Sequence, residues 1–330
     1  MASPTDAALV EHPIEEASAG AAVSLARIAE SALEVDCGGC GSTVAFAPPD
    51  TAGACPFCGA RIVAQPESAD PLLAPDGVLP FQVDRKRATE AMRAWIRTRW
   101  FAPNALKSMA RDAGMQGVYL PHWTYDASTH TDYVGERGEH YWETETYTET
   151  DSEGRTVERT RQVRRTRWWP ASGSVSRDFD DVLVPATRAV SDARLVALAP
   201  WDLASAVPFR GEYLSGFRAQ RYQLDPLEGM VSARGIMSGV IEHDVRRDIG
   251  GDEQRVWSKD TTYSGETFKH LLLPVWLAAY RYDGRVYQTM VNAQTGEVVG
   301  ERPYSIWKIA AAVVCGILLA IAIWWFTREG

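Results

Sequence analysis

Two Cys-x-x-Cys pairs constrain this chain more than any other feature. They are Cys37-Gly-Gly-Cys40 and Cys55-Pro-Phe-Cys58, separated by 14 residues and each followed by glycine. A tetrahedral Zn²⁺ ion needs four ligands that converge on one point, and two such turns supply two thiolates each. Glycine after the second cysteine lets backbone N–H groups turn toward the sulfurs. The spacing predicts a zinc ribbon over residues 35–65, whose structural Zn²⁺ ion is bound by Cys37, Cys40, Cys55 and Cys58.

Two disulfides or a redox pair are the alternative uses of these cysteines. A redox Cys-x-x-Cys is normally single and lies in a βαβ pattern, which is absent here. A Cys₄ site has no open coordination position, so we do not expect a catalytic zinc. Zinc-binding thiolates persist in a reducing compartment, which points to the cytoplasm. With 34 Lys and Arg against 43 Asp and Glu, the net charge is −9, and so acidic a chain is a poor general binder of polyanions.

The C-terminal stretch 306–326 is apolar apart from Lys308. As a helix it would be about 31 Å long, which matches the hydrocarbon core of a bilayer. Trp307 near its start, and two tryptophans near its end, are placed like an aromatic belt. A buried core helix is the alternative, but the segment is apolar on every face. We predict one transmembrane helix over 305–327, a C-terminal anchor that holds residues 1–304 on the cytoplasmic side of the inner membrane.

Two segments flank the predicted ribbon. Residues 1–34 are rich in alanine and acidic side chains, and we expect a mobile tail or a loose helix. Residues 66–80 contain four prolines and predict a stiff, extended linker between the ribbon and the body.

The body predicts an α+β fold with an antiparallel sheet. Asp84 and Asp225 are good N-caps for two amphipathic helices. Each helix is followed by an L-P-x-W motif, Leu120–Trp123 and Leu273–Trp276, that leads into strands. This weak repeat predicts two helix-plus-sheet modules, which we place at 81–199 and 200–304.

A long hairpin over 139–167 is the most regular part of the body. Glutamates of one strand and arginines of the other fall on odd positions, so they share a face. A turn about Ser152 would place Glu145 opposite Arg159. A register slipped by two residues would place Glu145 opposite Arg161 and keep the same faces. Either register predicts an acidic strand paired with a basic one.

Catalytic residues do not emerge from the sequence. Walker A, dinucleotide-binding, nucleophile-elbow and zincin motifs are absent. His122, Asp126, His130 and Asp132 could suggest a second metal site, but they are scattered over a strand and a turn, so we favour surface or packing roles. We therefore expect no enzyme activity and infer no small-molecule substrate.

The chain resembles a bacterial group of zinc-ribbon proteins with a C-terminal membrane helix. These proteins carry the label of transcription-factor-IIB-type zinc ribbons or of relatives of the primosomal replication helicase. The matching stretches are 37–58, 117–126, 268–276 and 292–297. The helicase label belongs to the ribbon alone, since this chain has no helicase motor. The resemblance implies a protein partner among membrane-scaffold systems.

The expected function is that of a membrane-anchored cytoplasmic adaptor that binds a protein partner at the inner membrane face. The alternative is a zinc-ribbon protein that binds nucleic acid while it is tethered to the membrane. The ribbon carries Arg61 as its one basic side chain, together with Asp36 and Asp50. Such a ribbon lacks the positive charge that phosphate contacts require, which argues against nucleic acid.

Overall fold

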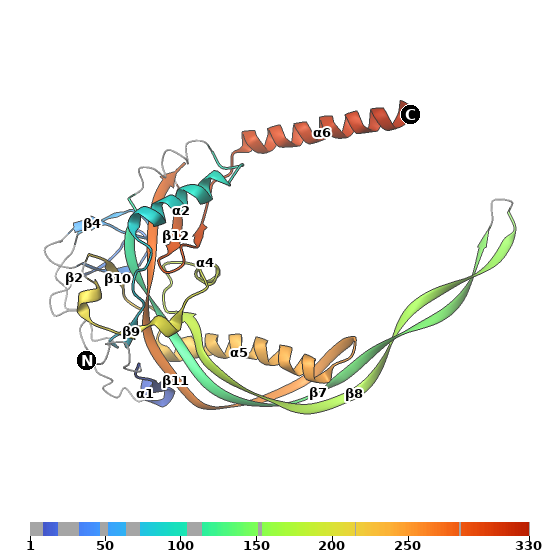
Figure 1. Ribbon diagram of the computed structural model, residues 1–330, viewed down its shortest axis with the longest axis horizontal. Coiled ribbons are helices and arrows are strands. Elements are labelled where there is room, and N and C mark those ends of the chain that lie inside the picture. The colour runs from blue at the N-terminus through green and yellow to red at the C-terminus, as the bar shows by residue number, and fades with distance from the viewer. Residues whose placement is uncertain are drawn as a thin grey trace.

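The computed structural model describes residues 9–18, 33–46, 52–63, 73–103, 114–150, 154–214, 216–283 and 285–329. Two long antiparallel strands, β7 (Gln116–Thr150) and β11 (Glu253–Tyr282), form the centre of an 11-stranded mixed sheet. β7 also pairs with β8 (Thr156–Pro185), and β11 pairs with β12 (Arg285–Asn292), which pairs with β13 (Val298–Gly300). With few helices beside this sheet, the predicted α+β class is confirmed (Figure 1).

The remaining elements are short or helical. The helices are α1 (Ile14–Ser18), α2 (Arg85–Arg97), α4 (Asp192–Ala197), α5 (Pro226–Ile249) and α6 (Ile306–Glu329), with 3-10 turns η1 (Leu203–Ser205) and η2 (Gly211–Leu214). The short strands are β1 (His12–Pro13), β2 (Leu33–Asp36), β3 (Thr43–Phe46), β6 (Gly77–Val78), β9 (Val207–Pro208) and β10 (Arg218–Gln220) in the large sheet, and β4 (Ala52–Ala54) with β5 (Arg61–Val63) in a separate pair.

The two L-P-x-W motifs lie side by side in the sheet. Leu120 of β7 pairs with Leu273 of β11 in antiparallel register, so the two motifs are related by a local twofold axis. Two short strands, β6 and β10, are related by the same local twofold axis. Val78, six residues before the cap Asp84, pairs with Leu272, and Ala219, six residues before the cap Asp225, pairs with Tyr119. Both pairings are parallel, so the weak sequence repeat corresponds to a structural repeat.

The helices follow the repeat as well. Asp84 and Asp225 cap α2 and α5, and each aspartate accepts a hydrogen bond from a backbone N–H three residues later. The indole of Trp276 donates to the carbonyl of Val83, just before the α2 cap. The indole of Trp123 donates to the carbonyl of Leu224, just before the α5 cap. Each tryptophan therefore fixes the start of the helix that belongs to the other repeat.

This exchange corrects the picture of two separate modules. Strand β6 pairs with β11 and helix α2 packs on β11 and β12, while β10 pairs with β7 and helix α5 packs on β7 and β8. Residues 81–199 and 200–304 thus build one sheet and do not form two sheets with separate helices. The sequence pattern located the repeat, but the pairing between repeats depends on contacts more than 100 residues apart in the chain.

Strand β7 passes through three environments. Its residues 117–125 are buried on both faces, and residues 127–135 alternate between buried and exposed because α5 covers one face only. Gly229 of α5 permits this close packing, since a Cβ atom there would lie 2.1 Å from the hydroxyl of Tyr125. Beyond Gly138 the strand leaves the sheet with β8 as its one partner. We call this two-stranded extension, residues 139–150 and 154–167, the arm.

The arm confirms the predicted hairpin in its slipped register. Glu145 pairs with Arg161, and their side chains form an ion pair of 3.0 Å between Oε2 and Nη2. Glu149 and Arg159 form another of 3.1 Å. In the unslipped register Thr150 would pair with Gly154, but Gly154 adopts a left-handed φ of +78° in the connection, and Thr150 pairs with Thr156. Exposed pairs of this kind contribute little stability and mainly maintain register.

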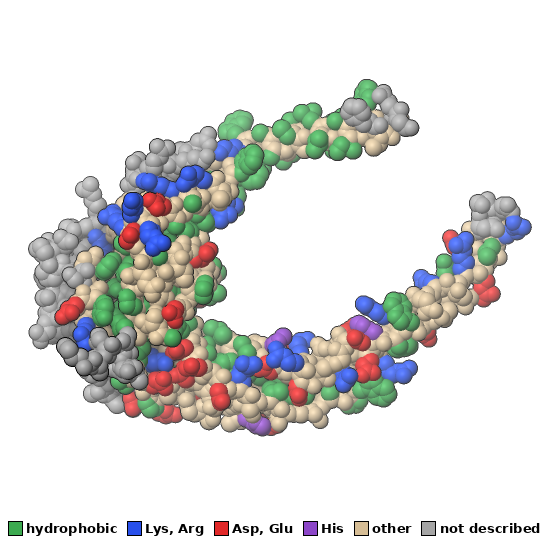
Figure 2. Space-filling view, in the orientation of Figure 1, with side chains coloured by type: hydrophobic (Ala, Val, Ile, Leu, Met, Phe, Trp, Pro, Cys, Tyr) green, Lys and Arg blue, Asp and Glu red, His purple; other side chains and the backbone are tan. Residues whose placement is uncertain are grey.

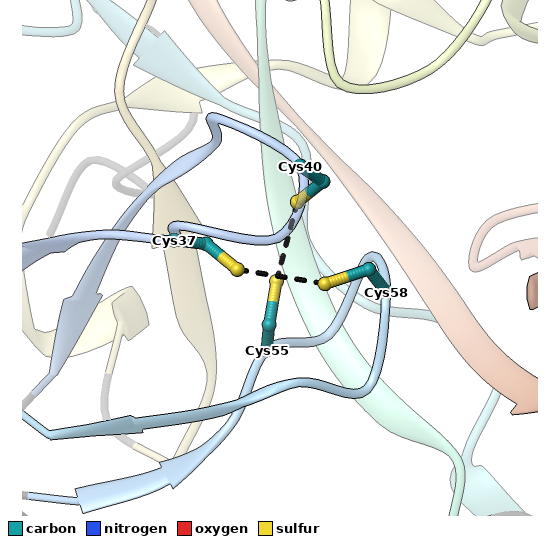
Figure 3. A group of neighbouring side chains, drawn as sticks. All are labelled: Cys37, Cys40, Cys55 and Cys58. Atoms are coloured by element: carbon teal, nitrogen blue, oxygen red, sulfur yellow. Dashed lines mark hydrogen bonds between the residues drawn. The ribbon is translucent and has the colours of Figure 1, made fainter.

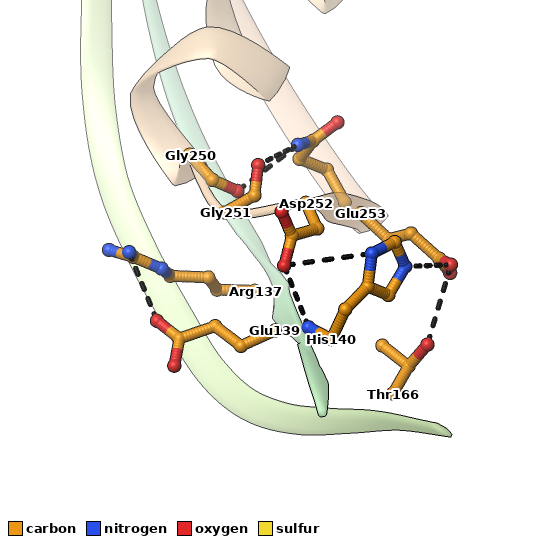
Figure 4. A network of polar contacts seen from close by, with 9 residues as sticks. Arg137, Glu139, His140, Thr166, Gly250, Gly251, Asp252 and Glu253 are labelled. Carbon is orange, nitrogen blue, oxygen red and sulfur yellow. Dashed lines mark hydrogen bonds and ion pairs between the residues drawn. The ribbon is translucent and has the colours of Figure 1, made fainter. Parts of the chain in front are cut away.

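A polar network closes the root of the arm (Figure 4). The backbone N–H of His140 donates to Asp252 at 2.7 Å, and its Nε2 lies 2.8 Å from Glu253. Asp252 lies in the turn that joins α5 to β11, which glycines 250 and 251 begin, and Glu253 is the first residue of β11. The network therefore ends the three-stranded part of the sheet and defines where the arm begins.

Shortening the arm should leave the body intact. We expect that deletion of Trp142–Arg164, with Tyr141 joined to Arg165 through an Asn-Gly turn, changes the thermal midpoint of the detergent-solubilised full chain by less than about 3 °C, because the deleted residues lie beyond the sheet and the helices. Circular dichroism during heating measures this change. Loss of cooperative unfolding would show instead that the arm belongs to the folding unit.

The described parts of the N-terminal and proline-rich segments pack on the body. Within 1–34, the described residues 9–18 pack on the body: β1 pairs with β11, and Ile14 is buried beside α5. Of the predicted linker 66–80, the described part 73–80 is built into the sheet through β6 and carries the buried Leu79. Burial of apolar side chains within both segments stabilises positions that their composition did not suggest.

Helix α6 leaves the body as a separate rod, on the same side as the arm (Figure 1). Its stretch Ile306–Trp325 is long and apolar enough to cross a membrane and is not buried against the rest of the structure. Its first turn is held by contacts with the turn after α2. The N–H of Ser305 donates to the carbonyl of Phe101 at 2.8 Å, and Lys308 Nζ donates to the carbonyl of Ala102 at 2.7 Å.

Candidate metal centre

The two cysteine turns have the same backbone geometry. Gly41 N–H donates to the carbonyl of Cys37 at 2.7 Å, and Gly59 N–H donates to that of Cys55 at 2.9 Å. Both glycines adopt left-handed φ angles, +70° and +72°. The glycine requirement that the sequence suggested is therefore met at both turns, since other residues rarely adopt this conformation.

The four sulfurs converge on one point (Figure 3). The Sγ atoms of Cys37 and Cys58 lie 3.4 Å apart, and those of Cys40 and Cys55 lie 3.7 Å apart. Tetrahedral coordination at Zn–S distances near 2.3 Å would place sulfurs about 3.8 Å apart. All four cysteines are free, so the disulfide alternative does not describe this structure. The cluster can hold a metal ion, and four thiolates are a ligand set that suits zinc.

Burial makes thiolates unfavourable at this cluster unless a cation is bound. Cys37 and Cys55 are almost fully buried. Burial raises the pKa of the Cys55 thiol and strongly raises that of the Cys58 thiol. A set of thiolates at this position therefore needs a compensating positive charge, which a divalent ion would supply.

The ribbon is part of the body and does not extend from it on a linker. Cys37, Cys55 and Phe57 share a buried cluster with Val118 of β7 and Val275 of β11. This cluster covers the sheet face opposite Trp123 and Trp276. The ribbon strand β3 also pairs with β10, which continues the central sheet.

Two glutamines and a serine complete the site, and none of the three was predicted from the sequence. Gln223 Nε2 donates to the carbonyl of Gly41 at 3.0 Å, and Gln288 donates to the carbonyl of Phe57. One body side chain thus holds each cysteine turn. The buried hydroxyl of Ser42 lies 3.1 Å from Cys40 Sγ and 3.5 Å from Cys55 Sγ. Ser42 follows a cysteine turn and could have been suspected, whereas no local signal identifies the distant glutamines.

The structure does not gather His122, Asp126, His130 and Asp132. His122 is buried, and its Nδ1 lies 3.1 Å from the carbonyl of Leu120. His130 and Asp132 are exposed neighbours on β7. Asp126 lies instead with Asp180 and Asp181, where Lys269 Nζ is 2.8 Å from Asp181 and 3.6 Å from Asp126. The ammonium group already supplies positive charge there, so we assign this cluster to structural ion pairing.

Comparisons with known proteins add one relative. The chain is 27% identical over 253 residues to the uncharacterised protein YdjG of Bacillus subtilis (strain 168). The aligned region covers 76% of this chain and 70% of the relative. No family model matches the chain. No solved structure matches it either.

Proposed function

We propose that the chain is a membrane-anchored adaptor, with a zinc-stabilised body in the cytoplasm and the arm as its partner-binding element. The observation that carries the anchor is the fully exposed apolar surface of α6 over Ile306–Trp325. A core helix of this composition would be buried, because water contact with so much apolar surface is unfavourable. The reduced cysteine cluster supports the cytoplasmic side.

The arm suits a protein partner better than nucleic acid. Its odd-numbered face carries glutamates and arginines that neutralise one another. Its even-numbered face is mostly threonine, with Glu158 and Arg164, around Trp142, whose exposed fraction is 67%. Large exposed aromatic side chains commonly anchor protein interfaces. The neutralised arginines offer little attraction to phosphate.

The direction of α6 has a consequence for insertion. A bilayer crossed by α6 at a right angle would also cut through the charged arm, because both leave the body on the same side (Figure 1). Burying the arm's ion pairs in lipid is strongly unfavourable. We therefore expect the angle between α6 and the arm to change when α6 inserts.

Removal of α6 tests the anchor. A chain that ends at Ser305 should move almost completely to the soluble fraction, while the full chain should stay in membranes after alkaline washing, because the deleted segment holds the one candidate span among the described residues. Fractionation and immunoblotting measure the distribution. A full-length variant is the matched control for truncation, because it loses apolar surface without losing chain length. It carries the four substitutions Ile309→Ser, Val313→Ser, Ile317→Ser and Ile321→Ser. A full chain that washes off at high pH would contradict the anchor.

A further inference from the structure

A polar cavity of about 620 Å³ opens beside the root of α6. It lies between the end of α2, the start of β12 and the segment that leads from β13 into α6. Its lining includes three arginines and three aromatic side chains, namely Arg99, Arg285, Arg302, Trp95, Tyr287 and Tyr304. Figure 2 shows Lys and Arg side chains gathered over α2 and the root of α6.

The cavity carries excess positive charge. Its lining carboxylate, Glu301, already lies 3.4 Å from Arg194, outside the cavity. Within the described part of the chain, no ion pair joins Arg99, Arg285 or Arg302 to a carboxylate. Arg99 stacks on Trp95 at 4.6 Å and Arg302 on Tyr304 at 5.2 Å, contacts that orient the guanidinium groups without satisfying their N–H groups.

One of the arginines that line this cavity has a buried, unsatisfied donor. Arg99 Nε is buried and has no hydrogen-bond partner among the described residues. Buried donors in folded proteins are nearly always satisfied, so the guanidinium of Arg99, a residue that lines the cavity, lacks part of its usual set of acceptors. An acceptor that also carries negative charge would neutralise the neighbouring arginines.

The cavity lies where the first headgroups would be if α6 crosses a bilayer. Trp100 and Trp307, with exposed fractions of 83% and 86%, flank the start of the apolar span. Exposed tryptophans beside an apolar span are typical of the headgroup region. The contacts of Ser305 and Lys308 with the turn after α2 keep the cavity next to that start.

We propose that this cavity binds the phosphate of an anionic phospholipid headgroup. Planar guanidinium forks of Arg99 and Arg302 would donate to phosphate oxygens, and Arg285 at the exposed rim would add charge. The site rests on the proposed membrane anchoring, because that anchoring brings headgroups to it.

Lipid binding to the full chain in neutral detergent tests the site. Native mass spectrometry would follow titration with phosphatidylglycerol, with phosphatidylcholine and with inorganic phosphate. We expect phosphatidylglycerol to bind at least about tenfold more tightly than phosphatidylcholine or phosphate, and this preference to disappear in Arg99→Gln/Arg302→Gln. Arg285→Gln alone, at the exposed rim, should weaken the preference and covers the case in which the double variant does not fold.

Arg188→Gln is the matched control, since Arg188 is an exposed arginine elsewhere on the body. Equal binding of the two lipids, or equal preference in the double variant and the control, would overturn the site. Inorganic phosphate that binds as tightly as phosphatidylglycerol would contradict the claim that the bound phosphate belongs to a lipid headgroup. Binding in detergent does not require α6 to cross a bilayer, so failure here is distinguishable from failure of the anchor in membrane fractionation.

Discussion

Cys55→Ser is expected to destabilise the body as well as the ribbon. Cys55 and Phe57 lie in the same buried cluster as Val118 and Val275, and β3 continues the central sheet through β10. Loss of the metal would release the two cysteine turns and expose this apolar face of the sheet. We expect the thermal midpoint of the body, followed by near-ultraviolet circular dichroism of its tryptophans, to fall by about 10 °C or more.

Metal analysis and a matched variant make this result specific. Zinc content should drop in Cys55→Ser and after chelation, and both should give the same lowered midpoint. Cys315→Ser removes the exposed cysteine of α6 and should change neither zinc content nor midpoint. A body that melts at its original temperature after zinc is lost would mean that the ribbon is an independent module.

Acid is expected to destabilise the body through two buried histidines. Burial lowers the pKa of His122 and of His270 to about 4, from an ordinary value near 6.5. Between these pH values the unfolded chain binds protons that the folded chain does not. The free energy of unfolding therefore falls as the pH drops from 6.5 toward 4, by on the order of 2 kcal/mol for each histidine at pH 5.

His270→Phe isolates one of these contributions. The ring lies 4.7 Å from that of Trp123 and 5.4 Å from that of Tyr222, so phenylalanine fits an aromatic cluster and cannot titrate. Denaturant unfolding at pH 7 and pH 5 should show a smaller loss in this variant than in the wild type, with zinc content checked at each pH. His243→Gln, at an exposed position, is the control. Equal losses in His270→Phe and the wild type would contradict the assignment.

Local patterns predicted the elements whose causes are local. The caps Asp84 and Asp225 located α2 and α5, and odd-position charges located the arm. The continuity between the Leu120–Trp123 motif and the hairpin was not predicted: β7 runs without interruption from Gln116 to Thr150, because β11 and α5 support its middle part. That support comes from chain segments far away in sequence, which periodicity does not reveal.

The metal centre, too, was predicted only in part from the sequence. Cys37, Cys40, Cys55 and Cys58 were identified from spacing, since zinc coordination imposes that spacing. Gln223 and Gln288 were not, because each reaches its cysteine turn only after the sheet has formed. The prediction of two separate modules was wrong. The tryptophans of β7 and β11 each donate a hydrogen bond to the residue before the helix cap of the other repeat, so the two repeats form one body.

Photo-crosslinking from the arm tests the adaptor function most directly. A photoreactive amino acid at Trp142 of the full chain, in the membranes of the native cell, is predicted to give a discrete crosslinked protein that is lost when the chain ends at Ser305. The same group at Val196, an exposed position on α4 away from the arm, should give no such product. Crosslinking from Trp142 that is no stronger or more specific than from Val196 would contradict the adaptor account.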